Sequence, residues 1–464
     1  MYRSGSVAVV VLLLTSGAGS AGTIGAPQIV KDIRADAEDS IPSELTKVGN
    51  RVFFGARNED GGVELYKTDG TGPGTKPVRD LDGPGDGSMS LVRELVEFEG
   101  KLYFGGRGNA GDLELWRTDG TFQGTFRVKN INPTPGADSE PSRFFDAGKM
   151  LLFAADDGVH GYDLWRTDGT PSGTKLVKDI RPGSSSAPQR FARVGKTSFF
   201  RAFTDDHGWE LWKTNGRRAG TKLVKDINAG PESSLLAPGK FGFQGSNLMG
   251  LKGKVYFAAT DGDRGFELWE SDGTRNGTQM VKNIFAGDGS SNPSNIAKLG
   301  RRIYFQASAS TNNAELWRSN GNASGTKLFK NLESPGGSFP FQLTNVGQRI
   351  FFTAYTTEIG EELWRTNGRK AGTKSIEICP GGDGSAPNSL VDIQGTLFFS
   401  ADNCSGEWQE LWVSNGTEAG TETAVINPGA PGSFPQNFVR LGDRVLFSAD
   451  EAQTGRELWR TELD

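Results

Sequence analysis

Apolar residues in this chain recur in short runs, separated by turns rich in glycine and short polar side chains. The stretch from Tyr162 to Ile180 shows the pattern: an apolar run, a turn at Asp168-Gly169, and a second apolar run. The first run carries a Glu/Asp-Leu-Trp/Tyr motif. Its Leu recurs at intervals of 47 to 57 residues, at Leu65, Leu115, Leu164, Leu211, Leu268, Leu316, Leu363, Leu411 and Leu458. Self-similarity at such a period indicates a solenoid, an array or a propeller.

Each repeat holds four strand-like runs, which we call a, b, c and d. Run b is the most regular, as in Val52-Phe53-Phe54 and Ile350-Phe351-Phe352, and run c is the Glu-Leu-Trp segment. These runs are apolar on both faces, as expected of a sheet enclosed between two neighbours. Four-stranded sheets arranged around an axis are propeller blades, so the pattern predicts an all-β propeller.

The two ends of the chain predict a closed ring of nine blades. The N-terminal part begins with an unaccompanied run d, residues 28–33, whereas the C-terminal part ends with runs a, b and c and has no d. Joining the two completes a ninth blade and removes the exposed sheet edges of an open stack. We therefore expect residues 22–464 to form one closed propeller, with the N-terminal strand joining the last blade.

The repeated motif resembles the bacterial repeat family named for Glu-Leu-Trp-x-x-Asp-Gly-Thr, found in exported proteins of myxobacteria and their relatives. Nine copies cover the chain beyond its N-terminal segment, with Tyr66 in place of Trp and Arg217 and Arg369 in place of the final Thr. The resemblance implies export and a propeller-like fold. It implies no catalytic residues.

Residues 1–21 have the form of a secretory signal peptide. Arg3 precedes an apolar stretch, and Gly19 and Ala21 are the small residues of a cleavage site. The apolar stretch is too short to span a bilayer, so we expect a secreted protein with no membrane span. The net charge is −5 and the charges are interspersed along the chain, which argues against a nucleic-acid partner.

Strand alternation assigns the connections to two faces of the ring. The a–b and c–d turns share one face, whose Asp-Gly-Thr turns are structural, and the variable b–c and d–a loops share the other. Variable loops on a rigid scaffold are where binding usually occurs. On that face three successive repeats place an aromatic residue before the motif, at Tyr162, Trp209 and Phe266. We prefer the interpretation that these rings fill space between blades; the alternative is a stacking platform for a ligand.

Further features of the same loops favour a binding site there. His160 and His207 lie in equivalent loops, and the longest repeat interval contains an insertion with Phe241 and Phe243. Two histidines near carboxylates are a candidate divalent-metal site, but duplication of one polar loop explains them more simply. The sequence thus predicts no cofactor and a binding site at Tyr162, Trp209, Phe266, His160, His207, Phe241 and Phe243.

The two cysteines, Cys379 and Cys404, fall at the same junction between repeats and on the same face. In an exported protein we expect them to form a disulfide.

No catalytic motif is present in the sequence, which favours a non-enzymatic function. The leading hypothesis is a secreted or cell-surface binding or adhesion module for a polysaccharide or a surface protein. The alternatives are a polysaccharide-cleaving hydrolase or lyase, because carboxylates are plentiful, or a structural subunit of an extracellular assembly. The sequence does not indicate an oligomeric state.

Overall fold

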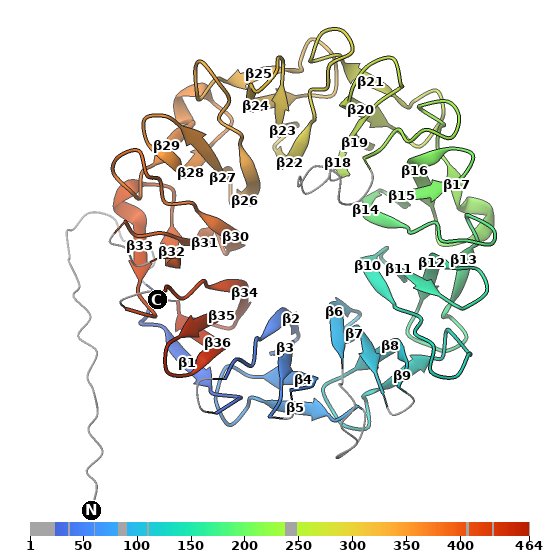
Figure 1. The fold of residues 1–464 in the computed structure, drawn as a ribbon, viewed down its shortest axis with the longest axis vertical. Coiled ribbons are helices and arrows are strands. Elements are labelled where there is room, and N and C mark those ends of the chain that lie inside the picture. Colours follow the sequence, from blue (N-terminus) through green and yellow to red (C-terminus); the bar gives the residue numbers. More distant parts are fainter. Residues whose placement is uncertain are drawn as a thin grey trace, which may run out of the picture.

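The computed structural model is a ring of nine four-stranded antiparallel sheets (Figure 1). It describes residues 24–35, 38–59, 61–81, 91–108, 111–236, 248–404, 408–428 and 431–463. The expected signal peptide and the predicted site residues Phe241 and Phe243 lie outside these ranges. The all-β propeller with nine blades, predicted from the repeat, is confirmed.

We number the sheets 1 to 9 in chain order. The strands of each sheet are given in spatial order, from the innermost strand at the axis of the ring to the outermost strand at its rim (Figure 1). Sheets 1 to 3 are β2 (Ser43–Val48), β3 (Arg51–Arg57), β4 (Val63–Thr68), β5 (Lys76–Arg79); β6 (Val92–Phe98), β7 (Lys101–Arg107), β8 (Leu113–Thr118), β9 (Phe126–Lys129); and β10 (Ser142–Asp146), β11 (Leu151–Asp156), β12 (Tyr162–Thr167), β13 (Lys175–Lys178). Sheets 4 to 6 are β14 (Gln189–Val194), β15 (Thr197–Thr204), β16 (Gly208–Thr214), β17 (Lys222–Leu223); β18 (Met249–Leu251), β19 (Lys254–Ala259), β20 (Glu267–Ser271), β21 (Gln279–Lys282); and β22 (Ser294–Leu299), β23 (Arg302–Ser308), β24 (Ala314–Ser319), β25 (Lys327–Lys330). Sheets 7 to 9 are β26 (Phe341–Val346), β27 (Arg349–Thr356), β28 (Gly360–Thr366), β29 (Lys374–Ile376); β30 (Asn388–Ile393), β31 (Thr396–Ala401), β32 (Glu410–Ser414), β33 (Thr421–Ala424); and β34 (Gln436–Leu441), β35 (Arg444–Glu451), β36 (Gly455–Glu462), β1 (Gln28–Lys31). Short 3-10 turns precede the last strands of sheets 4, 7 and 8, at Arg218–Gly220, Lys370–Gly372 and Glu418–Gly420.

The ring is closed by the N-terminal strand, as the chain ends predicted. Strand β1 pairs antiparallel with β36, with Gln28 opposite Arg460 and Ile29 opposite Trp459. An isolated bridge between Ile24 and Leu463 extends the pairing. Sheet 9 therefore contains both ends of the described chain.

The hydrophobic core is a series of layers, each between two neighbouring sheets. Phe53 and Leu65 of sheet 1, for example, pack with Leu102 and Phe104 of sheet 2. Because every sheet contributes to a layer on each side, its middle strands are apolar on both faces. This explains why the runs do not alternate between apolar and polar residues.

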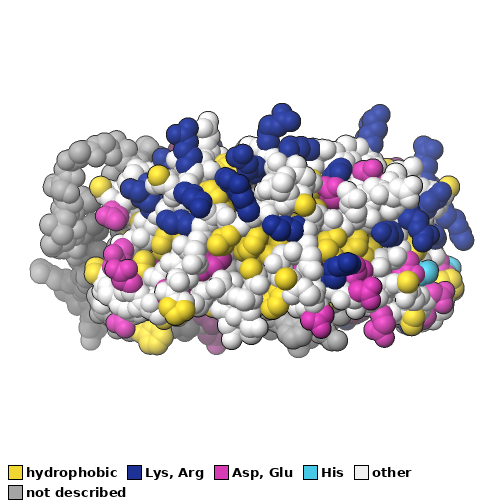
Figure 2. Space-filling view, turned by 90° about the horizontal axis from the view of Figure 1, so that it is seen from above, with side chains coloured by type: hydrophobic (Ala, Val, Ile, Leu, Met, Phe, Trp, Pro, Cys, Tyr) yellow, Lys and Arg dark blue, Asp and Glu magenta, His cyan; other side chains and the backbone are white. Residues whose placement is uncertain are grey.

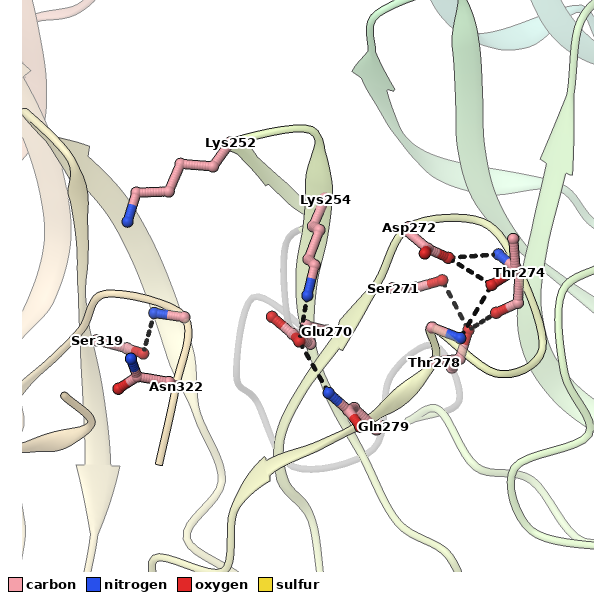
Figure 3. Close-up of polar contacts among 12 residues, drawn as sticks. Lys252, Lys254, Glu270, Ser271, Asp272, Thr274, Thr278, Gln279, Ser319 and Asn322 are labelled. Carbon is pink, nitrogen blue, oxygen red and sulfur yellow. Dashed lines mark hydrogen bonds and ion pairs between the residues drawn. The ribbon is translucent and has the colours of Figure 1, made fainter. Parts of the chain in front are cut away.

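The Asp-Gly-Thr segment forms the turn between the third and fourth strands, as Figure 3 shows for sheet 5. Asp272 Oδ1 accepts hydrogen bonds from the backbone N–H and the hydroxyl of Thr274, at 2.8 and 2.7 Å. Ser271 and Thr278 join the two strands through their hydroxyls, 2.7 Å apart. Asn replaces Asp in other copies because Oδ1 is the atom that the turn uses, as at Asn415. We call the side of the ring with these turns the turn face, and the opposite side the loop face.

In seven of the repeats that the structure describes, the acidic residue of the Glu-Leu-Trp motif connects successive sheets through a serine. Glu315 Oε2 accepts a hydrogen bond from the Ser338 hydroxyl at 2.7 Å, and the Ser338 carbonyl accepts one from Tyr355 N in the next sheet at 2.8 Å. We call this arrangement the serine latch. The same carboxylate-to-hydroxyl pair occurs as Glu114–Ser139, Asp163–Ser186, Glu267–Ser291, Glu362–Ser385, Glu410–Ser433 and Glu457–Ser40. The latch is a recurring hydrogen-bonded connection between blades, and Ser40 extends it across the ring closure.

A disulfide joins Cys379 and Cys404, whose Cα atoms are 5.5 Å apart, and confirms the predicted pairing. It ties the link after sheet 7 to the loop between the second and third strands of sheet 8. The two cysteines are separated by 25 residues, a closure that stabilises a fold by about 3 kcal/mol in the chain-entropy model.

Ring closure can be tested by deleting residues 26–34, which removes β1 and exposes the edge of β36. We expect the melting temperature to fall by more than about 5 °C, because sheet 9 loses a strand and its latch donor Ile33. A chain that begins at residue 24 is the control and should melt like the full-length protein. Equal melting of the deletion variant and the control would contradict the closed ring.

The latch carboxyls should make stability depend on pH. Glu210 occupies the latch position of sheet 4, where its carboxyl interacts with Ser234. Burial raises the pKa of Glu210 from 4.5 to about 8 and that of Glu457 to about 7. A folded-state pKa above the unfolded value means that the folded protein binds the proton more tightly. The contribution of these groups to the free energy of unfolding is therefore fully present below about pH 4.5 and is lost as pH rises to about 8. We expect the melting temperature to decrease over this interval.

The substitution Glu210→Gln should flatten this decrease, because the amide is neutral at every pH. Glu361→Gln, at an exposed position of the loop face, is the matched control and should leave the pH profile unchanged. If both variants follow the wild-type profile, the latch carboxyl is not the titrating group.

Candidate functional site: the axial cavity

One backbone feature is shared by the innermost strands of eight sheets: a bulge at which a non-glycine residue has a positive φ. The sheet register shifts at each bulge, for example between Ser43 and Thr46 in β2. The φ values lie between 51° and 61°, at Glu44, Glu94, Arg143, Arg190, Asn295, Gln342, Ser389 and Asn437. The equivalent position of sheet 5 lies outside the described residues. Left-handed backbone is unfavourable for side chains such as Glu and Arg, so an outlier of this kind is a reason to look for function.

The bulge keeps its shape around the ring while its side chain changes. The residues range from acidic to neutral to basic, whereas the turns and latches repeat nearly the same chemistry in every sheet. A position with constant backbone and variable side chains is where a repeat protein can acquire a specific site. We therefore treat the bulge residues as the candidate site.

Five of the bulge residues line a cavity of about 680 Å³ at the axis. They are Glu44, Glu94, Gln342, Ser389 and Asn437. The rest of the wall is mostly apolar: Leu45, Thr46, Leu95, Val96, Phe144, Leu390, Val391, Gln436 and Phe438. The volume falls in the range of small-molecule sites, which is about 300 to 1,000 Å³. Residues far apart in the sequence meet here only because the ring closes.

The two glutamates hold fixed positions in this wall. Glu44 Oε2 accepts a hydrogen bond from Leu95 N of the next sheet at 2.6 Å. Glu94 Oε2 accepts one from Arg143 N of the sheet after that, at 2.9 Å. In both carboxyl groups one oxygen is thus anchored by backbone. The Glu94 backbone also interacts with the Glu44 carboxyl.

The pKa of Glu44 is raised above its ordinary value. The main cause is desolvation by the protein walls around the axis, although the side chain itself reaches the solvent of the cavity. The hydrogen bond from Leu95 N acts in the opposite direction, and the negative charge of Glu94 adds to the increase. Two neighbouring carboxyl groups, one with a raised pKa, are a common arrangement at acid–base sites.

Arginines occupy the wall next to the glutamates. Arg143 lines a second cavity of about 310 Å³ together with Arg93, Glu94 and Tyr162. Burial lowers the pKa of the nearby Arg201 to about 10, and the positive charges of Arg190 and Arg143 add to the decrease. The axial wall therefore changes from acidic to basic between sheets 2 and 4.

Of the three predicted aromatic residues, Tyr162 lines one of the two cavities described above. It lines the smaller one beside Arg143, and burial raises the pKa of its hydroxyl. Trp209 packs against the core between sheets 4 and 5, with Phe203 5.7 Å away between ring centroids. Arg201 lies over its ring at 5.3 Å. Phe266 is half-buried and its backbone N–H donates to Ser290 Oγ at 3.0 Å. For Trp209, this packing agrees with the interpretation that the rings fill space between blades.

Each histidine of the predicted site is paired with its own aspartate. His160 Nδ1 lies 2.8 Å from Asp157 Oδ2, and His207 Nδ1 lies 3.1 Å from Asp226 Oδ2. Within the described ranges, no group of three His, Cys, Asp or Glu side chains is placed to hold a metal ion. The two loops are thus similar in chemistry without forming a joint site.

Sequence reasoning missed the bulge residues. Run a was recognised as a strand, but nothing in one repeat shows that its second residue has a positive φ. The available signal was the comparison of copies, in which this position varies between Glu, Arg, Asn, Gln and Ser while the apolar residues after it persist.

Comparison with known proteins gives structural neighbours only. No family model and no curated protein matches the chain, so the resemblance to the Glu-Leu-Trp-x-x-Asp-Gly-Thr family remains a prediction. Matching structures include a mutant puromycin hydrolase complexed with PGG (13% identity, TM-score 0.40, 80% of this chain and 60% of that chain) and one from a study of two prolyl endopeptidases (14%, 0.41, 80% and 55%). A puromycin-hydrolysing peptidase of Mycobacterium tuberculosis matches at 11% identity and a TM-score of 0.39, over 81% of this chain and 60% of that one.

These comparisons correct the leading functional hypothesis from the sequence. The matching structures are of peptidases and hydrolases, which does not agree with the expected binding or adhesion module for a polysaccharide or surface protein, and that expectation is withdrawn. The chain spans about 55% to 61% of the length of these proteins, and a likeness this low says nothing about a reaction or substrate.

The part of the chain that the structure describes contains no helix long and apolar enough to cross a bilayer.

Proposed function

We propose that the ring is a hydrolase that cleaves glycosidic bonds in its axial cavity. The observation that carries the proposal is the pair Glu44 and Glu94, which lie on adjacent innermost strands of one cavity. Glu44 has a raised pKa, and the charge of Glu94 contributes to it. Hydrolysis of a glycosidic bond needs two such carboxyl groups, one to donate a proton and one to accept one.

The remainder of the wall favours a neutral, hydroxyl-rich substrate. Gln342, Ser389 and Asn437 line the cavity, although the Gln342 amide also donates to Asn388 Oδ1 at 3.0 Å and the Asn437 amide to Ser448 Oγ at 3.2 Å. Amide and hydroxyl groups both donate and accept hydrogen bonds, which matches the hydroxyl groups of a sugar. Phe144 adds an apolar ring in the same wall, and an aromatic side chain there is suited to stacking on a sugar ring.

In the proposed reaction, the raised pKa assigns Glu44 the role of the acid and leaves Glu94 that of the base. Glu44 donates its proton to the leaving glycosidic oxygen while the bond from that oxygen to the anomeric carbon breaks. A water molecule forms the new bond to the anomeric carbon, and Glu94 accepts the proton of that water. One water is consumed, and proton exchange with solvent restores both carboxyl groups. The backbone bonds from Leu95 N and Arg143 N hold Oε2 of each group in place.

Activity should be measured as the release of reducing ends from a panel of neutral polysaccharides. We expect Glu44→Gln and Glu94→Gln each to lower kcat by about 100-fold or more, because each removes one proton transfer. Glu361→Gln, an exposed carboxyl of the loop face, is the matched control and should retain full activity.

The pH profile adds a second test. Glu44 must be protonated to act as the acid, so activity should fall as pH rises through its raised pKa. The proposal is wrong if the folded wild-type protein releases no reducing ends from any substrate, or if the Glu361 control loses as much activity as the cavity variants.

A further inference from the structure

The turn face of sheets 4 to 7 carries a dense arc of exposed basic side chains. We call it the basic arc. Its members come from the turns after the first and third strands: Arg193, Lys196, Arg217, Arg218, Lys222, Lys252, Arg275, Lys298, Arg301, Arg302, Lys327, Arg369, Lys370 and Lys374. Among the described residues of the same turns, Asp272 is the exposed acidic residue, and its Oδ1 accepts a hydrogen bond from Thr274 N. Figure 2, which views the rim of the ring, shows Lys and Arg gathered along one edge of the disc.

The loop face of the same sheets is acidic. Its exposed carboxylates are Asp205, Asp206, Glu232, Asp263, Asp288, Glu358, Glu361, Glu377 and Asp383. The exposed Arg264 on this side is paired with Asp261 at 2.8 Å. In sheets 4 to 7, a chain with a net charge of −5 therefore carries opposite charges on its two faces.

The linear sequence conceals this separation. Basic turns and acidic loops alternate along the chain, so the charges appear interspersed. Antiparallel strands then send every second connection to the same face of the ring. The result is a clustered cationic surface without any basic run in the sequence.

The basic arc is not explained by contacts within the ring. Among the described residues, none of its side chains is in an ion pair with a carboxylate, whereas the neighbouring Lys254 is paired with Glu270 at 2.5 Å. Figure 3 shows the contrast: Lys254 points to Glu270, and Lys252 extends away from it toward the turn of sheet 6. Its Nζ donates to the Asn320 carbonyl at 3.0 Å. Clustered like charges repel one another and destabilise a fold, so an external anion is the natural complement.

We propose that the basic arc docks the ring, turn face down, on an anionic lipid surface. The turns occupy equivalent positions in successive sheets and so present their charges at one level, as a flat bilayer requires. Each Lys or Arg near such a surface adds to the attraction within about one Debye length. The acidic loop face is repelled by the same surface, which fixes the orientation of the disc.

The test is co-sedimentation of the full-length protein with vesicles of phosphatidylcholine containing about 30 mol% phosphatidylserine, at about 0.1 M salt. We expect binding to these vesicles, at least tenfold weaker binding to pure phosphatidylcholine, and release at about 0.5 M salt. Arg301→Glu with Arg302→Glu and Lys327→Glu should reduce binding at least tenfold. These side chains are exposed, so melting temperature should be unchanged.

The matched control makes the same change of charge on the turn face outside the arc. Lys47→Glu with Lys76→Glu and Lys149→Glu alters exposed residues of sheets 1 and 3, and should reduce binding much less than the arc variant. Equal loss in the two variants, or equal binding to neutral vesicles, would overturn the proposal. So would two other outcomes: self-association without vesicles that the arc variant abolishes, which would assign the face to a second copy, or tighter binding to duplex DNA than to the anionic vesicles.

Discussion

The structure depends on the serine latch, in which a buried carboxylate binds the link that leads to the next sheet. In sheet 5, Glu267 accepts hydrogen bonds from Ile284 N at 2.7 Å, Phe285 N at 3.0 Å and the Ser291 hydroxyl at 2.7 Å. The Ser291 carbonyl then accepts a hydrogen bond from Ser308 N of sheet 6 at 2.9 Å. A buried charge without such partners would be strongly unfavourable, so the link can adopt only the path that satisfies the carboxylate. Because this constraint is repeated, it fixes the position of each sheet relative to the next, and the last sheet comes to lie beside the first.

The latch and the turns repeat shape, and this leaves other positions free to vary. The bulge on each innermost strand places a different side chain at the axis, and the connections place opposite charges on the two faces. Both features use the same geometry: equivalent residues of successive repeats become neighbours around a ring. A specific site can thus arise from single residues on several sheets without any change in the fold.

The sequence was sufficient to predict the features that are local or that repeat. Strand order, the structural Asp-Gly-Thr turn, closure by residues 28–33 and the Cys379–Cys404 disulfide follow from period, turn chemistry and strand alternation. The axial site was missed because a positive φ at Glu44 or Gln342 is a consequence of packing around the ring. Trp209, placed in a candidate binding site, packs between two sheets, since a partly polar loop does not reveal which side of an aromatic ring is covered.

The central claim is that Glu44 and Glu94 act on each other as a carboxyl pair at the axis. It is tested most directly by following the titration of the Glu44 carboxyl carbon by NMR, in the wild type and in Glu94→Gln. The account predicts a pKa above the ordinary value of 4.5 in the wild type and a lower one in the variant, because the variant lacks the neighbouring negative charge. A Glu44 that titrates at or below 4.5 in the wild type, or identically in both proteins, would contradict it.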